Sequence, residues 1–230
     1  AEIYPYSASY TGIAILFPVW AKTQEQFDVA KVERRQELAD YLRDRVNRRN
    51  GPEATLLGTE PWTGRTLADL AHEMEMPFED VLIDVIGPKG AYGAYFVMND
   101  ELQARLLQDP QIGVCSDGSP TGFHPRGHGT FAKIIETYVN ERQVLSLPEA
   151  IRKMTSFAAG VIGIRDRGTI APGMKADILV FDPAAVHATA TYPEPLQLAD
   201  GFDIVIVNGQ VARESGTTSD ALHGRVLQPE

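Results

Sequence analysis

The sequence has one cysteine, no long apolar run and a deficit of positive charge. With a single cysteine among 230 residues, no disulfide can form within the chain, which is compatible with a reducing compartment. The 31 acidic residues outnumber the 21 basic ones and give a net charge of -10. That balance argues against nucleic acid and against a membrane surface as partners, because both bind basic faces.

No stretch approaches the roughly 18 apolar residues of a membrane span, and no signal peptide is recognised. We therefore expect a cytoplasmic protein, with the periplasm as the alternative. The chain begins at Ala1 without a methionine, so we expect either a processed terminus or a missing upstream segment.

Histidine is also scarce, with five residues and no H-x-H pair. His72-Glu73 resembles the start of an H-E-x-x-H zinc motif, but position 76 is methionine. His124 and His128 are four residues apart, yet the intervening proline and glycine argue against a helix there. We therefore do not expect these two histidines to act as paired metal ligands.

The spacing of apolar residues predicts an amphipathic helix from Thr23, as N-cap, to a point before Asn50. Strands and helices then alternate from Ala94 to Tyr138, which favours a parallel sheet or barrel with reactive groups at the carboxyl ends of strands. The elements expected along the chain are strands at 3–11, 54–60, 94–98 and 112–115, and helices starting at Thr66, Pro77, Asn99, Phe131, Ser146 and Thr155 or Ser156.

The character of the chain changes near Arg167. Short β-branched runs follow, separated by Pro, Gly, Asn and Asp, and Asn208-Gly209 is typical of a type I′ hairpin turn. We therefore place a boundary near residue 165, with a first domain at 1–165 and an all-β segment at 166–230.

The stretch from Gln111 to Thr130 carries the leading candidate for chemistry. A short apolar strand ends at Ser116-Asp117-Gly118 and opens into a loop rich in Gly, Pro and His. A strand that ends at an acidic residue is how α/β enzymes present a catalytic carboxylate. The alternative is an ordinary turn, because Asp-Gly is a common turn pair.

Several motifs together resemble the C-terminal half of the amidohydrolase superfamily, and in particular the D-aminoacylase (N-acyl-D-amino-acid deacylase) family. The G-x-I-x-x-G-x-x-A-D-I pattern is shared across the superfamily, whereas the other motifs narrow the resemblance. The motifs are Tyr4-Pro5-Tyr6, Tyr95-Phe96-Val97-Met98, Ser116-Asp117-Gly118, His124-Pro125-Arg126, Gly129-Thr130-Phe131 and Gly168 to Ile178.

This resemblance implies an α/β fold: part of a TIM-type (β/α)8 barrel, namely its last strands and helices, followed by a small β-sandwich. It implies zinc, as one or two ions, and hydrolysis of an N-acyl-D-amino acid to a carboxylate and a free D-amino acid. Asp117 matches the aspartate that touches the metal and serves as general base and acid. A carboxylate suits that role, because it can take a proton from water and return it to the departing amine.

The resemblance also implies substrate-binding residues. Tyr95 and Met98 match positions that line the acyl or side-chain pocket of the family, although packing in a buried strand would explain them equally well. Side chains alternate between the two faces of a strand, so a regular strand would place these two residues on opposite faces. We therefore expect Met98 to lie past the end of the strand. Tyr4 either reaches the site or packs as an ordinary aromatic. Arg126 either binds the substrate's carboxylate through a bidentate pair or forms an ion pair that orders the loop.

The sequence departs from the family in the metal ligands. In the family, the H-x-H pair, the ligand cysteine and the further histidines all belong to the upstream half of the enzyme, and residues 1–230 contain no equivalent of them. Cys115 is not at the position of the ligand cysteine, so we interpret it as a buried apolar thiol. A complete barrel needs about 250 residues. We therefore expect the upstream half of the same enzyme as a partner, besides the small-molecule substrate and a homo-oligomer.

The sequence is compatible with two other interpretations. A cyclic-amide hydrolase related to dihydroorotase or hydantoinase would share the closing domain and the strand-end aspartate. A non-catalytic fragment or subunit would explain the absent histidines and would expose apolar surface where strands are missing.

Overall fold

The computed structural model describes residues 1–227 as an α/β protein. The chain forms two compact units. Unit 1 comprises Ala1–Pro5, Asp100–Thr121 and the chain from Pro125 onward, and unit 2 comprises Tyr6–Asn99 with Gly122–His124. Most of unit 2 is thus inserted between the first and second pieces of unit 1, and Gly122–His124 lies between the second and third. The boundary near residue 165 lies inside unit 1, and the division into domains at that point stays a prediction.

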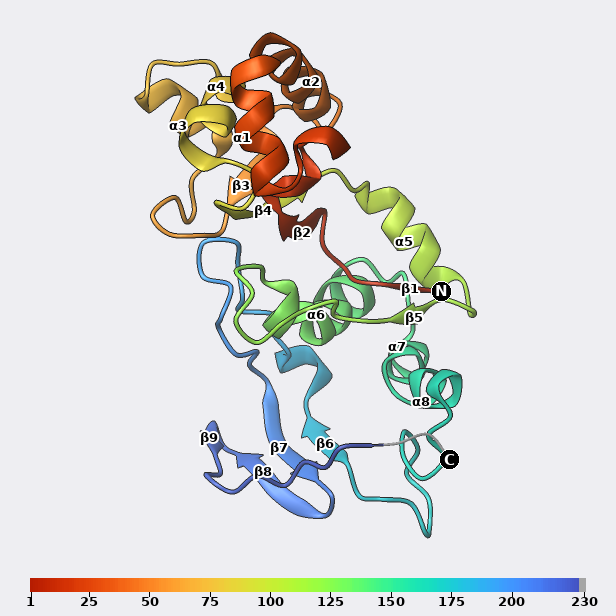
Figure 1. Ribbon diagram of the computed structural model, residues 1–230. Helices are drawn as coiled ribbons and strands as arrows, with labels where there is room; N and C mark the ends of the chain where they lie inside the picture. The colour runs from red at the N-terminus through yellow and green to blue at the C-terminus, as the bar shows by residue number, and fades with distance from the viewer. Residues whose placement is uncertain (228–230) are drawn as a thin grey trace. The chain divides into compact units, whose positions relative to one another are not determined.

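Unit 2 is built on a three-stranded antiparallel sheet of order β2-β4-β3, coloured red to yellow in Figure 1. Its strands are β2 (Ala8–Gly12), β3 (Thr55–Leu57) and β4 (Tyr92–Phe96). Its helices are α1 (Gln24–Glu33), α2 (Arg35–Asn47), α3 (Leu67–Glu73) and α4 (Phe78–Val81), with a π-helical segment at Leu82–Ile86 and 3-10 turns at Ile13–Ile15, Val19–Ala21 and Pro52–Ala54.

Two features of unit 2 correct the sequence-based expectations. The helix from Thr23 is two helices, α1 and α2, separated at Arg34. A continuous helix would place Arg34 on the buried face, four residues after Ala30 and four before Leu38; instead its guanidinium lies 3.9 Å from the centroid of the Trp20 ring. Strand β4 pairs antiparallel with both neighbours, so the expectation that it belongs to a parallel sheet is wrong.

Unit 1 contains a short parallel pair and a separate antiparallel sheet. β1 (Glu2–Ile3) pairs in parallel with β5 (Gly113–Val114). The second sheet has the order β6-β7-β8-β9, with strands β6 (Ile178–Phe181), β7 (Phe202–Val207), β8 (Gln210–Glu214) and β9 (Thr217–Thr218). The helices are α5 (Asp100–Gln108), α6 (Arg126–Lys133), α7 (Leu147–Met154) and α8 (Ser156–Ile162), with a π-helical segment at Ile134–Glu141 and a 3-10 turn at Pro183–Ala185.

Local signals at helix ends and turns are confirmed. Helices begin at Thr23, Thr66 and Ser146, as expected. The Ser146 side chain accepts a hydrogen bond from the backbone N–H of Glu149, and the structure adds that Thr23 and Thr66 each form a capping box. Asn208 and Gly209 both have positive φ, 51° and 78°, at the turn joining β7 to β8. These features depend on a few adjacent residues, which is why the sequence alone predicted them.

The last residues of the G-x-I-x-x-G-x-x-A-D-I segment form hydrogen bonds with the turn between β7 and β8. The Asp177 Oδ1 atom accepts a hydrogen bond of 2.8 Å from the backbone N–H of Asn208, and Gly209 N–H donates to the Ala176 carbonyl at 2.8 Å. Arg167 donates to both Asp177 and Asn208. The motif therefore has a structural role, which is to fasten the segment before β6 to the β7–β8 turn.

The two units have separate apolar cores. In unit 2 a single cluster joins α1, α2, α3 and α4 to the sheet, with Leu38, Leu42, Leu57 and Leu70 fully buried. In unit 1 the residue Val114 of β5 packs with Leu107, Ile134 and Tyr138. Burying β5 in this way fixes the start of the segment that leads to Asp117. None of the helices in residues 1–227 has the length and hydropathy of a membrane span.

Candidate functional site

Asp117 lies in the segment that follows the parallel strand β5, after Cys115 and Ser116. The strand's last link to β1 is the hydrogen bond of 3.1 Å from Cys115 N–H to the Ile3 carbonyl. Asp117 then adopts a left-handed conformation with φ of 44°, which aspartate tolerates better than most residues. Its side chain is 61% exposed. The local backbone therefore turns the carboxylate outward at the carboxyl end of a buried strand.

Arg126, at the start of α6, binds this carboxylate. Its Nη1 atom lies 2.9 Å from Asp117 Oδ2, and the arginine side chain is 8% exposed. The sequence left open whether Arg126 pairs within the loop or binds a substrate, and the structure shows the pair. Because the aspartate is largely exposed, we expect this ion pair to stabilise the fold by no more than about 1 kcal/mol. Its main consequence is orientation of the carboxylate.

Tyr4, just after β1, lies beneath the same guanidinium. The Arg126 Cζ atom is 4.8 Å from the centroid of the Tyr4 ring, within the range of a cation–π contact. Burial raises the pKa of Tyr4, an effect partly opposed by Arg126. Tyr4 is therefore a neutral hydroxyl at physiological pH, able to donate a hydrogen bond. Unit 1 thus brings Tyr4, Asp117 and Arg126 together.

Cys115 lies between the end of β5 and Asp117. Burial raises the pKa of its thiol, with the charges of Glu2 and Asp117 acting in the same direction. The thiol is therefore protonated near neutral pH and is a weak metal ligand in that form.

Glycines allow the loop after Asp117 to pack against α6. A Cβ atom on Gly118 would lie 2.4 Å from the Gly127 Cα atom, and one on Gly127 would lie 2.7 Å from the Ser119 carbonyl oxygen. The backbones can approach this closely because neither residue has a side chain. The expectation that no helix forms before Thr130 is therefore wrong: α6 begins at Arg126, with Pro125 as its N-cap.

The two histidines of this segment have different environments. His124 is buried in unit 2, where its Nε2 atom is 3.1 Å from the Ala8 carbonyl oxygen and its ring contacts Tyr6 and Tyr10. His128 lies on α6 in unit 1. Across residues 1–227 no group of three or more His, Cys, Asp or Glu side chains is arranged to hold a metal ion.

Tyr95 and Met98, the other expected substrate-binding residues, belong to unit 2. Tyr95 lies in β4 and is fully buried, and Met98 follows the strand's end with 37% exposure. Burial raises the pKa of the Tyr95 hydroxyl. The expected position of Met98 past the strand is confirmed, whereas the role of both residues in substrate binding stays a prediction.

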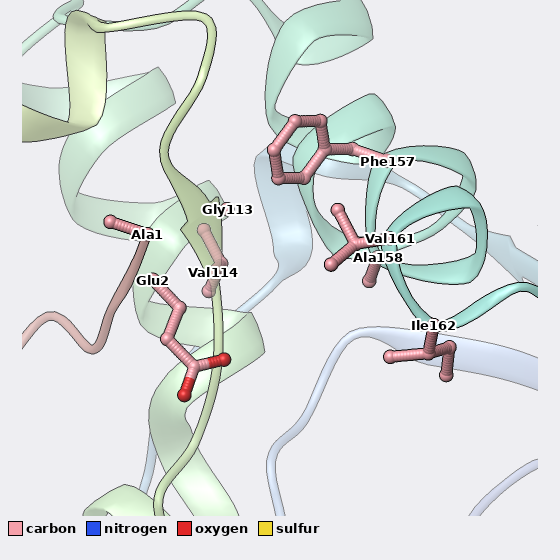
Figure 2. Close-up of a pocket in the computed structure, with 8 residues that line it drawn as sticks. All are labelled: Ala1, Glu2, Gly113, Val114, Phe157, Ala158, Val161 and Ile162. Atoms are coloured by element: carbon pink, nitrogen blue, oxygen red, sulfur yellow. The ribbon is translucent and has the colours of Figure 1, made fainter.

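Unit 1 also has an apolar cavity of about 290 Å³ beside β1 and β5. Figure 2 shows the side chains of α8 across from Gly113 and Val114. A Cβ atom on Gly113 would lie 2.9 Å from the Phe157 ring. The lining is Ala1, Glu2, Gly113, Val114, Phe157, Ala158, Val161 and Ile162. Since Glu2 is the only ionisable side chain among these, the cavity is distinct in chemistry from the Asp117 group.

Lys153 is a buried cation that the sequence did not single out. Its side chain has no exposed surface, and its Nζ atom donates to the carbonyls of Asp109 and Ile112, the latter at 2.7 Å. The signal in the sequence was positional, because Lys153 follows the buried Ala150 by three residues on the same face of α7. Lys153 therefore holds the segment that leads into β5.

The parallel β1–β5 pair and the helices around it place the chain among α/β proteins, in which ligands bind beyond the carboxyl ends of parallel strands. Comparison with known protein families identifies the family within this class. Residues 63–213 match the model of the amidohydrolase family, and the chain belongs to that family.

Individual relatives extend the comparison. The chain is 37% identical over 169 residues to an N-acyl-D-aspartate deacylase of Alcaligenes xylosoxydans xylosoxydans, a match that covers 73% of this chain and 33% of the relative. A solved D-aminoacylase superposes with a TM-score of 0.76 at 28% identity, covering 99% of this chain and 42% of that one. An N-acyl-D-glutamate deacylase from Bordetella bronchiseptica, solved with zinc and a phosphonate inhibitor, gives 0.71 at 27% identity, covering 94% and 40%. The chain therefore spans between a third and about two fifths of the length of these relatives.

Proposed function

We propose that this chain is part of a zinc-dependent enzyme that hydrolyses the amide bond of N-acyl-D-amino acids to a carboxylate and a free D-amino acid. The parallel β1–β5 pair would then belong to a (β/α)8 barrel, and the β6–β9 sheet to a closing β-sandwich after residue 165. The remaining metal ligands would come from an upstream half.

The observation that carries the proposal is the placement of Asp117. Its carboxylate projects from the end of a parallel strand and is held by a buried guanidinium 2.9 Å away. The relatives named above, which act on N-acyl-D-amino acids, support the same assignment. A positioned carboxylate can take a proton from the attacking water and later return it to the amine nitrogen as the carbon–nitrogen bond breaks.

Tyr4 and Arg126 have chemistry suited to the substrate's free carboxylate. A guanidinium binds a carboxylate through paired N–H donors, and a neutral tyrosine hydroxyl adds one more donor. Tyr95 and Met98 would line the acyl or side-chain pocket, as the family resemblance implies. Each of these four residues would bind or orient substrate, while Asp117 would move the proton.

Zinc would polarise the amide carbonyl when bound, and Asp117 is the one ligand we assign to it in this chain. A protein zinc site needs at least three ligands, and residues 1–227 gather no such group. The described residues therefore do not form a zinc site by themselves, and Asp117 can contribute only one ligand to a shared site.

The test is amine release from N-acetyl-D-aspartate, N-acetyl-D-glutamate and N-acetyl-D-leucine by the purified enzyme, with zinc content measured in parallel. The L-enantiomers and a cyclic panel of hydantoin and dihydroorotate accompany them. We expect Asp117→Asn to lower kcat by about 10²–10⁴, the contribution typical of general acid–base catalysis.

Asp220→Asn is the matched control, because it makes the same chemical change at an exposed position of the C-terminal segment. Wild-type turnover in Asp117→Asn would remove that residue from the reaction. Faster hydrolysis of the cyclic amides would transfer the assignment to a cyclic-amide hydrolase.

A further inference from the structure

Two adjacent cations of α7 bind the segment that enters β5. The Lys153 Nζ atom donates to the Asp109 carbonyl and, at 2.7 Å, to the Ile112 carbonyl. The Arg152 Nη2 atom donates to the Pro110 carbonyl at 2.8 Å. Three carbonyls within four consecutive residues therefore accept hydrogen bonds from this helix, and the last of them directly precedes the strand.

Strand β5 has only a short backbone ladder of its own. Its parallel pairing with β1 joins Glu2 to Gly113 and Ile3 to Val114. Among residues 1–227 no second strand pairs with it. A short two-stranded sheet is marginally stable, and parallel pairing is slightly weaker than antiparallel pairing. The backbone of β5 therefore needs further contacts to hold its position.

Lys153 is a fully buried cation that supplies such contacts. Its side chain has no exposed surface, and the Oε1 atom of Glu149 lies 3.7 Å from Nζ. Lysine is almost never fully buried unless it is paired, because removing a charge from water is costly. An ammonium has three N–H donors on one atom, which matches the two carbonyls and Glu149. Lys153 therefore ties both carbonyls to one point of α7, which an apolar side chain could not do.

We propose that Lys153 is a positioning residue for Asp117, an inference that rests on the proposed function of that carboxylate. Asp117 follows Ile112 by five residues, and an extended chain of that length spans about 16 Å. Most of this path is β5 and the Cys115 N–H, which donates to the Ile3 carbonyl at 3.1 Å. A displacement at the start of β5 is thus passed along a short, hydrogen-bonded backbone to the carboxylate. A misplacement of about 1 Å can lower a catalytic rate about 10²-fold.

The first test compares kcat and KM of Lys153→Met with those of the wild-type enzyme, with N-acetyl-D-aspartate as substrate. We expect kcat to fall at least tenfold and KM to change less than threefold, because the residues assigned to substrate binding keep their side chains. Gly209→Ala is the matched control, since it strains the β7–β8 turn of the same unit without changing a contact of β5. Its kcat per folded molecule should equal that of the wild type.

Hydrogen exchange gives a second readout that does not depend on turnover. The amides of Gly113 and Cys115 donate to the carbonyls of Ala1 and Ile3. Relative to the amides of β7 in the same protein, they should exchange at least tenfold faster in Lys153→Met than in Gly209→Ala. If the wild-type enzyme shows no turnover, the proposed function fails, and this measurement alone decides whether Lys153 holds β5.

Arg152→Gln keeps the test decisive if Lys153→Met does not fold. The Arg152 side chain is 36% exposed, so its replacement leaves no buried gap, and it removes only the hydrogen bond to Pro110 and the pair with Glu149. The same amides should then exchange about threefold faster, and kcat should fall by a similar factor. The inference is refuted if the folded variants keep wild-type kcat and wild-type exchange in β5, or if Gly209→Ala loses as much kcat as Lys153→Met.

Discussion

Replacing Lys153 with methionine should destabilise the protein by about 2–4 kcal/mol. The lysine Nζ atom donates to the carbonyls of Asp109 and Ile112 and lies 3.7 Å from Glu149 Oε1. A hydrogen bond from a charged donor contributes about 1.5–3 kcal/mol, so two such bonds give a gross loss of about 3–6 kcal/mol. The net loss of stability is smaller than this gross value, because methionine fills a similar volume and leaves no buried charge.

The pH dependence of stability gives a second readout for the same change. Burial lowers the pKa of Lys153 below the ordinary lysine value. Between the two values the unfolded chain binds more protons than the folded one, so wild-type stability should rise as the pH increases toward about 10.4. The methionine variant should lack this component, and the difference in stability between the two proteins should therefore grow with pH.

The assay is urea unfolding followed by far-ultraviolet circular dichroism at several pH values. Lys175→Met, at an exposed position of the same unit, is the control and should change stability by less than about 0.5 kcal/mol. Equal unfolding midpoints for Lys153→Met and the wild type would refute the reasoning, because the two carbonyls would then have no need of the lysine.

Gly118→Ala should lower the unfolding free energy by about 1–3 kcal/mol in the same urea assay, because its Cβ atom would lie 2.4 Å from the Gly127 backbone. Gly209→Ala should lower the unfolding free energy by about 1 kcal/mol because of the positive φ of 78° alone, since nothing lies near its Cβ position. A larger loss of stability in Gly209→Ala than in Gly118→Ala would contradict this account. Hydrogen bonds from Arg35 hold the pKa of Asp84 at about 2. The ionised Asp84 therefore stabilises the folded protein above the ordinary aspartate pKa of about 3.9, and this contribution should be lost as the pH falls toward 2. Asp84→Asn should abolish that acid dependence and cost about 0.5–1 kcal/mol at pH 7 by chemical denaturation; an unchanged acid profile would exclude the pair as its cause.

Elements defined by a few adjacent residues could be predicted from the sequence. The caps at Thr23, Thr66 and Ser146 and the turn at Asn208 depend on local hydrogen bonds and backbone preferences. The break at Arg34 could not be predicted by the same rules, because it depends on which face of the helix meets the core of unit 2. Periodicity shows that a helix is amphipathic but not whether it is interrupted.

Pairing between distant strands was the other point at which local reasoning failed. Alternation of strands and helices predicted a parallel arrangement that would include β4, yet β4 lies in the inserted unit and pairs antiparallel with β2 and β3. The insertion separates β1 from its parallel partner β5 along the chain. Neither strand carries enough residues for its partner to be read from its own pattern.

The candidate site also has one feature that the sequence predicts and one that it does not. The place of Asp117 after a strand follows from its immediate sequence, whereas its partner depends on how the loop folds back to the start of α6. For Arg126, a loop ion pair and a substrate contact were equally compatible with the sequence. The close approach of Gly118 and Gly127 brings the loop after Asp117 against the start of α6, where Arg126 lies.

The exposure of the two partners shows which of them can change its contacts. Arg126 is 8% exposed and held by its surroundings, whereas Asp117 is 61% exposed on a turn. A substrate or cation arriving at this pair would therefore find the guanidinium in a fixed position and the carboxylate able to rotate. A carboxylate already neutralised by a guanidinium attracts a cation weakly, since the arginine charge opposes a second positive ion. Zinc binding at Asp117 would consequently require ligands in addition to those that residues 1–227 bring together, and the arginine would then be released from the aspartate for a substrate carboxylate.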